Sequence, residues 1–92
     1  MNDEPQNWKV LLSKQPQKII RRLPKPLRER MVEAIDTLVE NQHPPNSKQL
    51  IGYDHLYRLR VGDWRIVYTV KDEKLIVLII RIAPRGGVYK GL

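Results

Sequence analysis

Residues 57–68 read YRLRVGDWRIVY, and this stretch decides the fold of the chain. Its centre, Gly62-Asp63, is a residue pair that favours a two-residue β-hairpin turn. The residues on both sides are rich in β-branched and aromatic types, which favour strands. The stretch therefore predicts two antiparallel strands, Tyr57 to Val61 and Trp64 to Val70, joined by that turn.

The predicted hairpin gathers positive charge on one face of the sheet. A two-residue turn pairs Arg60 with Arg65 and Leu59 with Ile66, and directly opposite residues share a face. Arg58, Arg60 and Arg65 therefore lie together, with the apolar pair on the other face. Like charges placed opposite each other destabilise a sheet by a few tenths to about 1 kcal/mol. Because the planar guanidinium suits phosphate, we interpret the cluster as an anion-binding site; the alternative is an ordinary solvated strand face.

The segments that flank the hairpin extend the sheet. Residues 75–82 follow a weaker turn at Asp72-Glu73 and are almost wholly apolar, which predicts a central strand covered on both faces. Towards the N-terminus, residues 8–12 alternate in polarity and predict a short opening strand. Residues 41–48 contain two adjacent prolines and are expected to form only a loop.

Two helices are predicted between the opening strand and this loop. Ser13 is placed to cap the first helix, and Pro24 and Pro26 end it and begin the second, because proline fits only the first turn of a helix. Apolar residues of the second helix recur at spacings of three and four and form one stripe: Leu27, Met31, Ala34, Ile35 and Leu38. The result is an α+β fold with an N-terminal strand, an αα-hairpin and a three-stranded antiparallel meander, the helices packing on one face of the sheet.

Length and charge narrow the classes of function. The chain has 92 residues, which suits a single domain spanning residues 1–92. Its 17 basic and 10 acidic residues give a net charge of +7. Such a charge suits a polyanionic partner, which means a nucleic acid, an acidic protein or a membrane surface.

Membrane insertion, secretion and metal chemistry are not indicated. The longest apolar run, residues 75–80, is too short to span a bilayer, and the acidic N-terminus is unlike a secretion signal. We therefore expect a cytoplasmic protein. The chain has no cysteine, and His43 and His55 lack the spacing of metal ligands, so no metal site and no cofactor is expected.

The C-terminal segment adds two further candidates to the arginine cluster. Arg85 follows the apolar strand, and Tyr89 lies four residues after it. Gly86-Gly87 between them would let the chain turn back towards the sheet. A tyrosine beside arginines can stack on a base or exchange a proton, although a packing role is an equal alternative.

These motifs resemble those of the RelE toxins of bacterial toxin–antitoxin pairs, within the RelE/ParE superfamily. The similar residues are the block from Tyr57 to Tyr68, the apolar strand after it and the ending Ile82-Ala83-Pro84-Arg85-Gly86-Gly87-Val88-Tyr89-Lys90. The resemblance covers nearly the whole chain, because the strand, the helix pair and the meander come in the same order. It implies a metal-independent endoribonuclease that cuts messenger RNA in the ribosomal A site and is silenced by a small acidic antitoxin.

The resemblance also implies the roles of individual residues. Such toxins have two basic residues before the turn, an arginine on the next strand, an arginine after the last strand and a terminal tyrosine; here these are Arg58, Arg60, Arg65, Arg85 and Tyr89. We assign catalysis to Arg65, Arg85 and Tyr89. RNA binding is assigned to Arg58, Arg60, Trp64 and Lys90. The first two positions are lysines in the best-known members, and arginine effectively cannot lose its proton, so the general base stays unassigned.

Two other functions are compatible with the same residues. The ParE branch shares the fold and inhibits gyrase, although it generally lacks the full basic and aromatic set. A non-catalytic module would use the cations only to bind nucleic acid or an acidic antitoxin. For a nuclease toxin, the expected partners are its cognate antitoxin, in a hetero-oligomer, together with messenger RNA and the ribosome.

Overall fold

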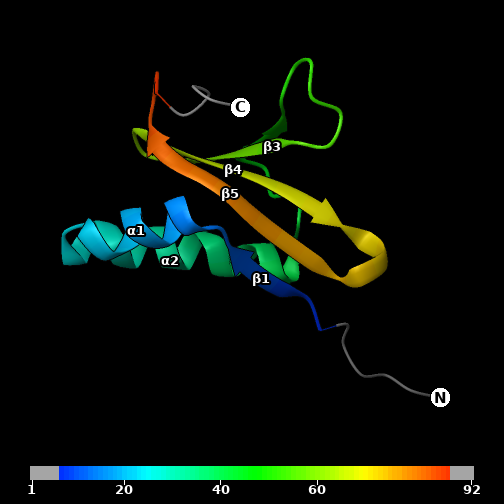
Figure 1. Ribbon diagram of the computed structural model, residues 1–92, viewed down its shortest axis with the longest axis horizontal. Helices are drawn as coiled ribbons and strands as arrows, with labels where there is room; N and C mark the ends of the chain where they lie inside the picture. Colours follow the sequence, from blue (N-terminus) through cyan, green and yellow to red (C-terminus); the bar gives the residue numbers. More distant parts are fainter. Residues whose placement is uncertain (1–6, 88–92) are drawn as a thin grey trace.

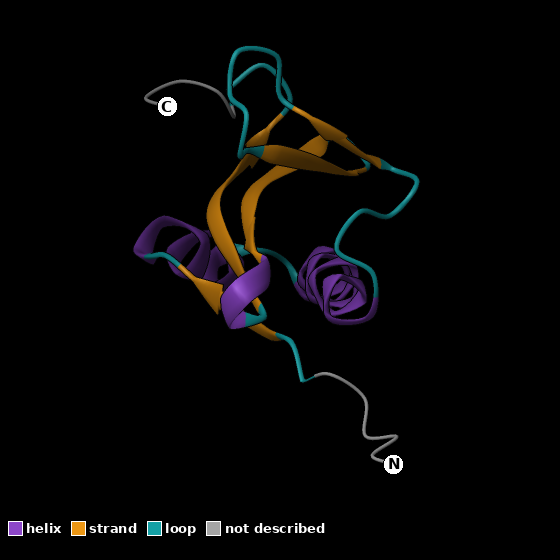
Figure 2. Ribbon diagram, turned by 90° about the vertical axis from the view of Figure 1, so that its right-hand side faces the viewer, coloured by secondary structure: helices purple, strands orange, loops and turns teal. Residues whose placement is uncertain are grey.

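The computed structural model describes residues 7–87, which form one mixed β-sheet and two helices. The elements follow in the order β1 (Lys9–Leu12), α1 (Lys14–Arg22), α2 (Lys25–Glu40), β2 (Ser47–Gln49), β3 (Tyr57–Val61), β4 (Trp64–Lys71), the 3-10 turn η1 (Asp72–Lys74) and β5 (Ile76–Pro84). The five strands lie in the order β1-β5-β4-β3-β2. Both helices lie below β3, β4 and β5 in Figure 1, and Figure 2 shows that the sheet is curved. The predicted α+β fold is confirmed.

β3 and β4 form the predicted hairpin with the predicted register. Arg60 lies opposite Arg65, and Leu59 lies opposite Ile66. Gly62 begins the turn with a φ of +59°, a left-handed conformation that glycine adopts without steric cost. A β-carbon at Gly62 would lie 3.3 Å from Nη2 of Arg30 on α2, a flexible side-chain tip that can move aside, so the positive φ rather than crowding favours glycine here.

The segment expected to form only a loop contains most of a strand. β2 pairs with β3 in antiparallel fashion and places Lys48 opposite Arg58, so the expectation for residues 41–48 is wrong at its end. Two hydrogen bonds anchor this pairing: Arg60 N donates to Asn46 O at 3.2 Å, and Asn46 Nδ2 donates to Arg60 O at 2.9 Å. The three residues of β2 are polar, so only pairing with a distant strand makes them a strand.

β1 pairs in parallel with β5, and the start of α1 continues that contact. Leu12 lies opposite Ile79, and Ser13 N donates to Ile79 O at 3.0 Å. The side-chain amide of Gln15 then donates to Ile82 O at 2.7 Å and accepts from Ile82 N at 2.8 Å. Ser13 does occupy the predicted capping position, but its side chain makes no capping hydrogen bond.

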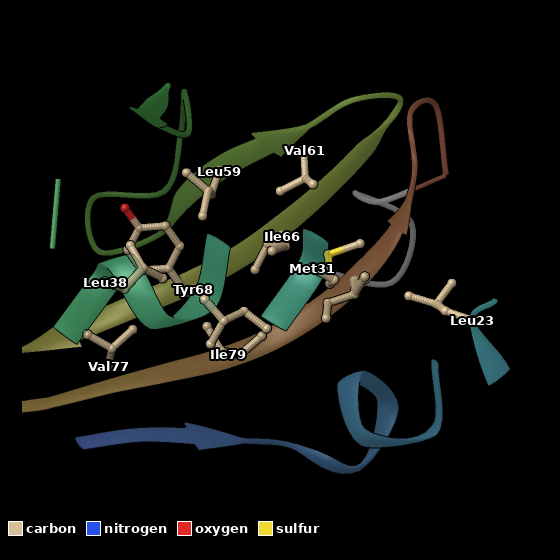
Figure 3. Close-up of a cluster of buried hydrophobic side chains, with 11 residues drawn as sticks. Leu23, Met31, Leu38, Leu59, Val61, Ile66, Tyr68, Val77 and Ile79 are labelled. Atoms are coloured by element: carbon tan, nitrogen blue, oxygen red, sulfur yellow. The ribbon is translucent and has the colours of Figure 1, made fainter. Parts of the chain in front are cut away.

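The main core lies between the helices and the sheet (Figure 3). Three members of the predicted stripe on α2, Met31, Ile35 and Leu38, are buried, and Leu27 and Ala34 pack beside them partly buried. The strands contribute buried residues from one face of the sheet: Leu59, Val61, Ile66, Tyr68, Val77, Ile79 and Ile82. Because residues of both helices join this one cluster, both helices cover the same face.

β5 lies inside the sheet, between β1 and β4, as expected for an apolar strand. Its helix-facing residues are buried, but Leu78 and Ile80 on the other face are only half-buried. The outer face of β5 is therefore covered only in part, which is less than expected. Within residues 7–87 both helices lie on the opposite side, and only a small second cluster packs on the outer face: Leu56, Val67 and Ala83, with Leu50 and Ile80.

The buried Tyr68 yields a pH-dependent prediction. Its hydroxyl donates to Gln42 O at 2.8 Å, and burial raises the pKa of Tyr68 above the ordinary value of 10.0. Because the neutral form is favoured in the folded state, its stabilisation is complete below pH 10 and is lost as the pH rises through the folded-state pKa. We expect Tyr68→Phe to lower the free energy of unfolding by about 0.5–1.5 kcal/mol at pH 7. Above pH 10, the wild type should lose stability more steeply than this variant.

Urea denaturation at pH 7 and at pH 10.5 measures both effects. Tyr53→Phe is the matched control, because Tyr53 is 39% exposed and makes no such buried hydrogen bond among residues 7–87. Equal pH dependence of the wild type and Tyr68→Phe would contradict the assignment.

Candidate nucleic-acid interface

The sheet face turned away from the helices carries the predicted arginine cluster. Leu59 and Ile66 point into the core, so the alternating Arg58, Arg60 and Arg65 point to the outer face. Arg60 is exposed, whereas Arg58 and Arg65 are half-buried. The structure therefore brings together the three arginines that the hairpin register predicted.

Arg65 is held in place by the turn that it follows. Its Nη1 donates to Gly62 O at 3.1 Å and to Trp64 O at 3.0 Å. Both bonds use one terminal nitrogen, and within residues 7–87 the other guanidinium nitrogens make no hydrogen bond, so they can donate to a ligand. A planar cation fixed before its ligand arrives is suited to stabilising developing negative charge.

Arg85 joins Arg65 at the same turn. Its backbone N donates to Asp63 O at 2.7 Å, which places the end of β5 against the hairpin turn. A hollow of about 420 Å³ opens here, and three of the predicted arginines line it together with the two turn residues: Arg60, Arg65 and Arg85, with Gly62 and Asp63. We call it the turn hollow. Asp63 is a carboxylate at this place, and the sequence had indicated it only as a turn residue.

A second hollow continues the basic surface along β3. It has a volume of about 390 Å³ and is lined by Pro45, Asn46, Lys48, Arg58 and Arg60. Arg60 lines both hollows, so the two adjoin. Lys48 was missed by sequence reasoning, because its cross-strand position opposite Arg58 exists only once β2 has paired.

Arg81 is a further cation on the outer face, and no motif in the sequence had indicated it. The pairing of β4 with β5 shifts between Val67 and Tyr68, and this β-bulge leaves Ile80 without a partner. Arg81 consequently lies opposite Val67, and Val67 in turn lies opposite Arg58. Without the bulge, strict alternation from Ile79 would turn the side chain of Arg81 into the core. Its Nε is buried and has no hydrogen-bond partner among residues 7–87.

Other predicted residues lie elsewhere. Trp64 packs against the main core and lies opposite Val61 and Pro84, so the structure does not bring it together with the arginines. His43 contacts Tyr57 edge-on, with ring centroids 4.7 Å apart, and Tyr57 also packs against the core. The remaining two candidates fall outside the described residues: Tyr89 and Lys90.

The described part of the chain shows neither a metal-binding cluster nor a membrane-spanning helix. Among residues 7–87 no histidines and carboxylates gather in a group that could hold a metal ion. In the same range no helix is long and apolar enough to cross a membrane.

Comparison with known proteins points to one group of toxins. Residues 10–89 match the family described as the ParE toxin of the type II toxin-antitoxin system, parDE. The putative toxin RelE1 of Methanocaldococcus jannaschii is 34% identical over 86 residues, covering 90% of this chain and 96% of the relative. A putative RelE-like toxin protein of Escherichia coli is 30% identical over 66 residues, covering 70% of this chain and 68% of the relative.

Solved structures that resemble this chain are also structures of RelE toxins. The archaeal RelE–RelB complex from Pyrococcus horikoshii contains a chain that superposes with a TM-score of 0.78 at 31% identity, covering 88% of this chain and 98% of the other. The isolated Escherichia coli RelE toxin superposes with a TM-score of 0.73 at 22% identity, covering 87% and 85%, which supports the fold alone.

Proposed function

This chain belongs to the RelE/ParE superfamily of type II toxin–antitoxin systems as a RelE-type toxin, and on that premise we propose that it is an endoribonuclease. Its substrate is messenger RNA in the A site of the ribosome, and it acts in the cytoplasm. The observation that carries this proposal is the turn hollow, which Arg60, Arg65 and Arg85 line together. Three guanidinium groups around one site suit a phosphodiester.

The proposed reaction uses the 2′-hydroxyl of the RNA as the nucleophile. Its oxygen attacks the adjacent phosphorus, the bond from phosphorus to the 5′-oxygen breaks, and the products carry a 2′,3′-cyclic phosphate and a 5′-hydroxyl. Arg65 stabilises the charge of the pentacoordinate phosphate, because the turn already holds its guanidinium in place. Arg85 donates a hydrogen bond to the leaving 5′-oxygen, which becomes the 5′-hydroxyl by taking a proton from water. Tyr89 stacks on a base or, as the phenolate, accepts the 2′-proton.

The second hollow extends the proposed site along the RNA backbone. Arg58 and Lys48 lie opposite each other on neighbouring strands, so they can hold a phosphate next to the one that is cut. Phosphate contacts of this kind position the strand without reading its sequence. The ribosome would then supply the orientation of the message, which the toxin alone provides only in part.

An acidic antitoxin is the proposed protein partner. The chains from Pyrococcus horikoshii and Methanococcus jannaschii superpose on this one within RelE–RelB and RelB–RelE complexes. The net charge of +7 favours an acidic partner here as well. We propose a hetero-oligomer in which the antitoxin silences the toxin.

A gyrase-inhibiting toxin is the second candidate function. It is favoured by one observation, the match of residues 10–89 to the family described as the ParE toxin. The three arginines at the turn hollow favour the nuclease instead, because inhibition of gyrase requires no group that stabilises a pentacoordinate phosphate.

Mapping of message 5′ ends tests the nuclease. We expect purified toxin to cut a message at the A-site codon when translating ribosomes are present, and to leave fragments that carry a 5′-hydroxyl. The same message without ribosomes should be cut far more slowly. An intact message together with inhibited DNA supercoiling by gyrase would contradict the proposal and support the second candidate.

A further inference from the structure

A third hollow lies at the end of the basic surface, under the loop between β2 and β3. Its volume is about 510 Å³, and its lining combines cations with apolar and aromatic side chains: Lys48, Gln49, Leu50, Ile51, Tyr53 and Arg58. Lys48 and Arg58 also line the second hollow, so the two adjoin. In Figure 1 the loop, drawn in green beside β3, rises on the side of the sheet away from the helices.

This loop has a defined shape. Leu50 N donates to Leu56 O at 2.9 Å, which closes the loop at its base, and Tyr53 N donates to Leu50 O at 3.2 Å. The side chain of Gln49 donates to Asp54 O at 2.6 Å and so links the end of β2 to the far side of the loop. Leu56 is buried in the outer-face cluster and anchors the loop to the sheet. A ligand would therefore meet a wall that is already formed.

The loop exposes one large apolar side chain and one aromatic side chain. Ile51 is 98% exposed and Tyr53 is 39% exposed. Single apolar residues on a surface are ordinary, but here both line one hollow whose other wall is cationic. An aromatic ring beside Lys and Arg side chains is the combination with which proteins bind single-stranded nucleic acid: the base stacks on the ring and the phosphate pairs with the cations.

We propose that this hollow is a subsite for one nucleobase of the RNA, which stacks on Tyr53 while Lys48 and Arg58 hold its phosphate. The subsite rests on the proposed function and adds a base contact to it. Arg60 and Arg58 are two residues apart on β3, about 7 Å along the strand, which is comparable to one nucleotide of extended RNA. The stacked base therefore belongs to a nucleotide one or two positions from the bond that is cut.

Messages with a single abasic nucleotide test the subsite on ribosomes. Each position on either side of the A-site cut is made abasic in turn, and single-turnover cutting rates are measured at subsaturating toxin. We expect one position to slow the wild type by about 5- to 150-fold, the range of losing one base–aromatic stack. Tyr53→Ala should slow cutting of the normal message by a similar factor and be insensitive to that abasic position. Tyr53→Phe should behave as the wild type, and so should His55→Ala, which changes an exposed residue of the same loop outside the lining.

The remaining outcomes separate the subsite from the nuclease. If the wild type cuts and Tyr53→Ala cuts equally well, the subsite is overturned and the nuclease stands. The subsite is also overturned if Tyr53→Ala weakens antitoxin binding while cutting is unchanged, because the hollow then holds a side chain of the antitoxin. A wild type that neither cuts a message on ribosomes nor binds RNA overturns both proposals.

Discussion

Arg65→Ala is expected to lower the single-turnover rate of message cutting by about 100-fold or more, the usual cost of removing one preorganised donor from a charged transition state. Two hydrogen bonds to the backbone of the turn hold the guanidinium of Arg65 before any RNA arrives. In the wild type, orienting this cation therefore costs little free energy during the reaction. Alanine removes the cation, and the exposed turn carbonyls can then bind water.

Two variants distinguish this role from simple loss of charge. Arg65→Lys keeps the charge but lacks the planar fork, so its cutting rate should lie between those of alanine and arginine. Arg22→Ala removes an equal charge from an exposed position at the end of α1 and should cut nearly as fast as the wild type. The assignment is wrong if Arg65→Ala cuts within a few-fold of the wild type. Thermal unfolding of each variant checks that its fold is intact.

Leu38→Ala is expected to lower the free energy of unfolding by about 2–5 kcal/mol. Leu38 is fully buried in the main core, near Tyr68 and Val77 in Figure 3. Removal of its side chain forfeits the transfer free energy of the methyl groups and leaves a cavity between α2 and the sheet. For a domain of this size, whose total stability is of the order of 5–15 kcal/mol, such a loss is large.

Val32 provides the matched control on the same helix. It is 41% exposed, so Val32→Ala should change the free energy of unfolding by about 0.5 kcal/mol or less. Urea denaturation of both variants gives the comparison. If both variants lost a similar amount of unfolding free energy, the packing of α2 on the sheet would not be what stabilises the protein. If Leu38→Ala is unfolded in water, Leu38→Val should show the same effect in smaller measure.

Much of the candidate site follows from one short turn. Gly62-Asp63 sets the pairing of Arg60 with Arg65, and alternation along each strand then assigns the arginines and Ile66 to opposite faces. Both rules act over a few neighbouring residues, so they could be applied without knowledge of the rest of the chain. For the same reason the apolar stripe on α2 was predictable, because helical periodicity is local.

The residues that were missed or misplaced depend on contacts between distant segments. β2 is a strand because Asn46 and Arg60 exchange hydrogen bonds across fourteen positions. Arg81 faces outward because a bulge interrupts the alternation of β5. Trp64 was grouped with the RNA-binding residues, yet its strand position turns it towards the core.

The arginine-bearing hairpin was thus determined by the sequence itself, since a two-residue turn and a period of two leave one arrangement of its side chains. Only the tertiary structure decided that Arg85 meets Arg65 at the turn, and that three hollows join into one surface from Arg85 to Tyr53. The physical reason is the range of the forces involved. Turn conformation and strand alternation are set by adjacent residues, whereas strand order, the bulge and the hollows arise when segments far apart in the chain pack together.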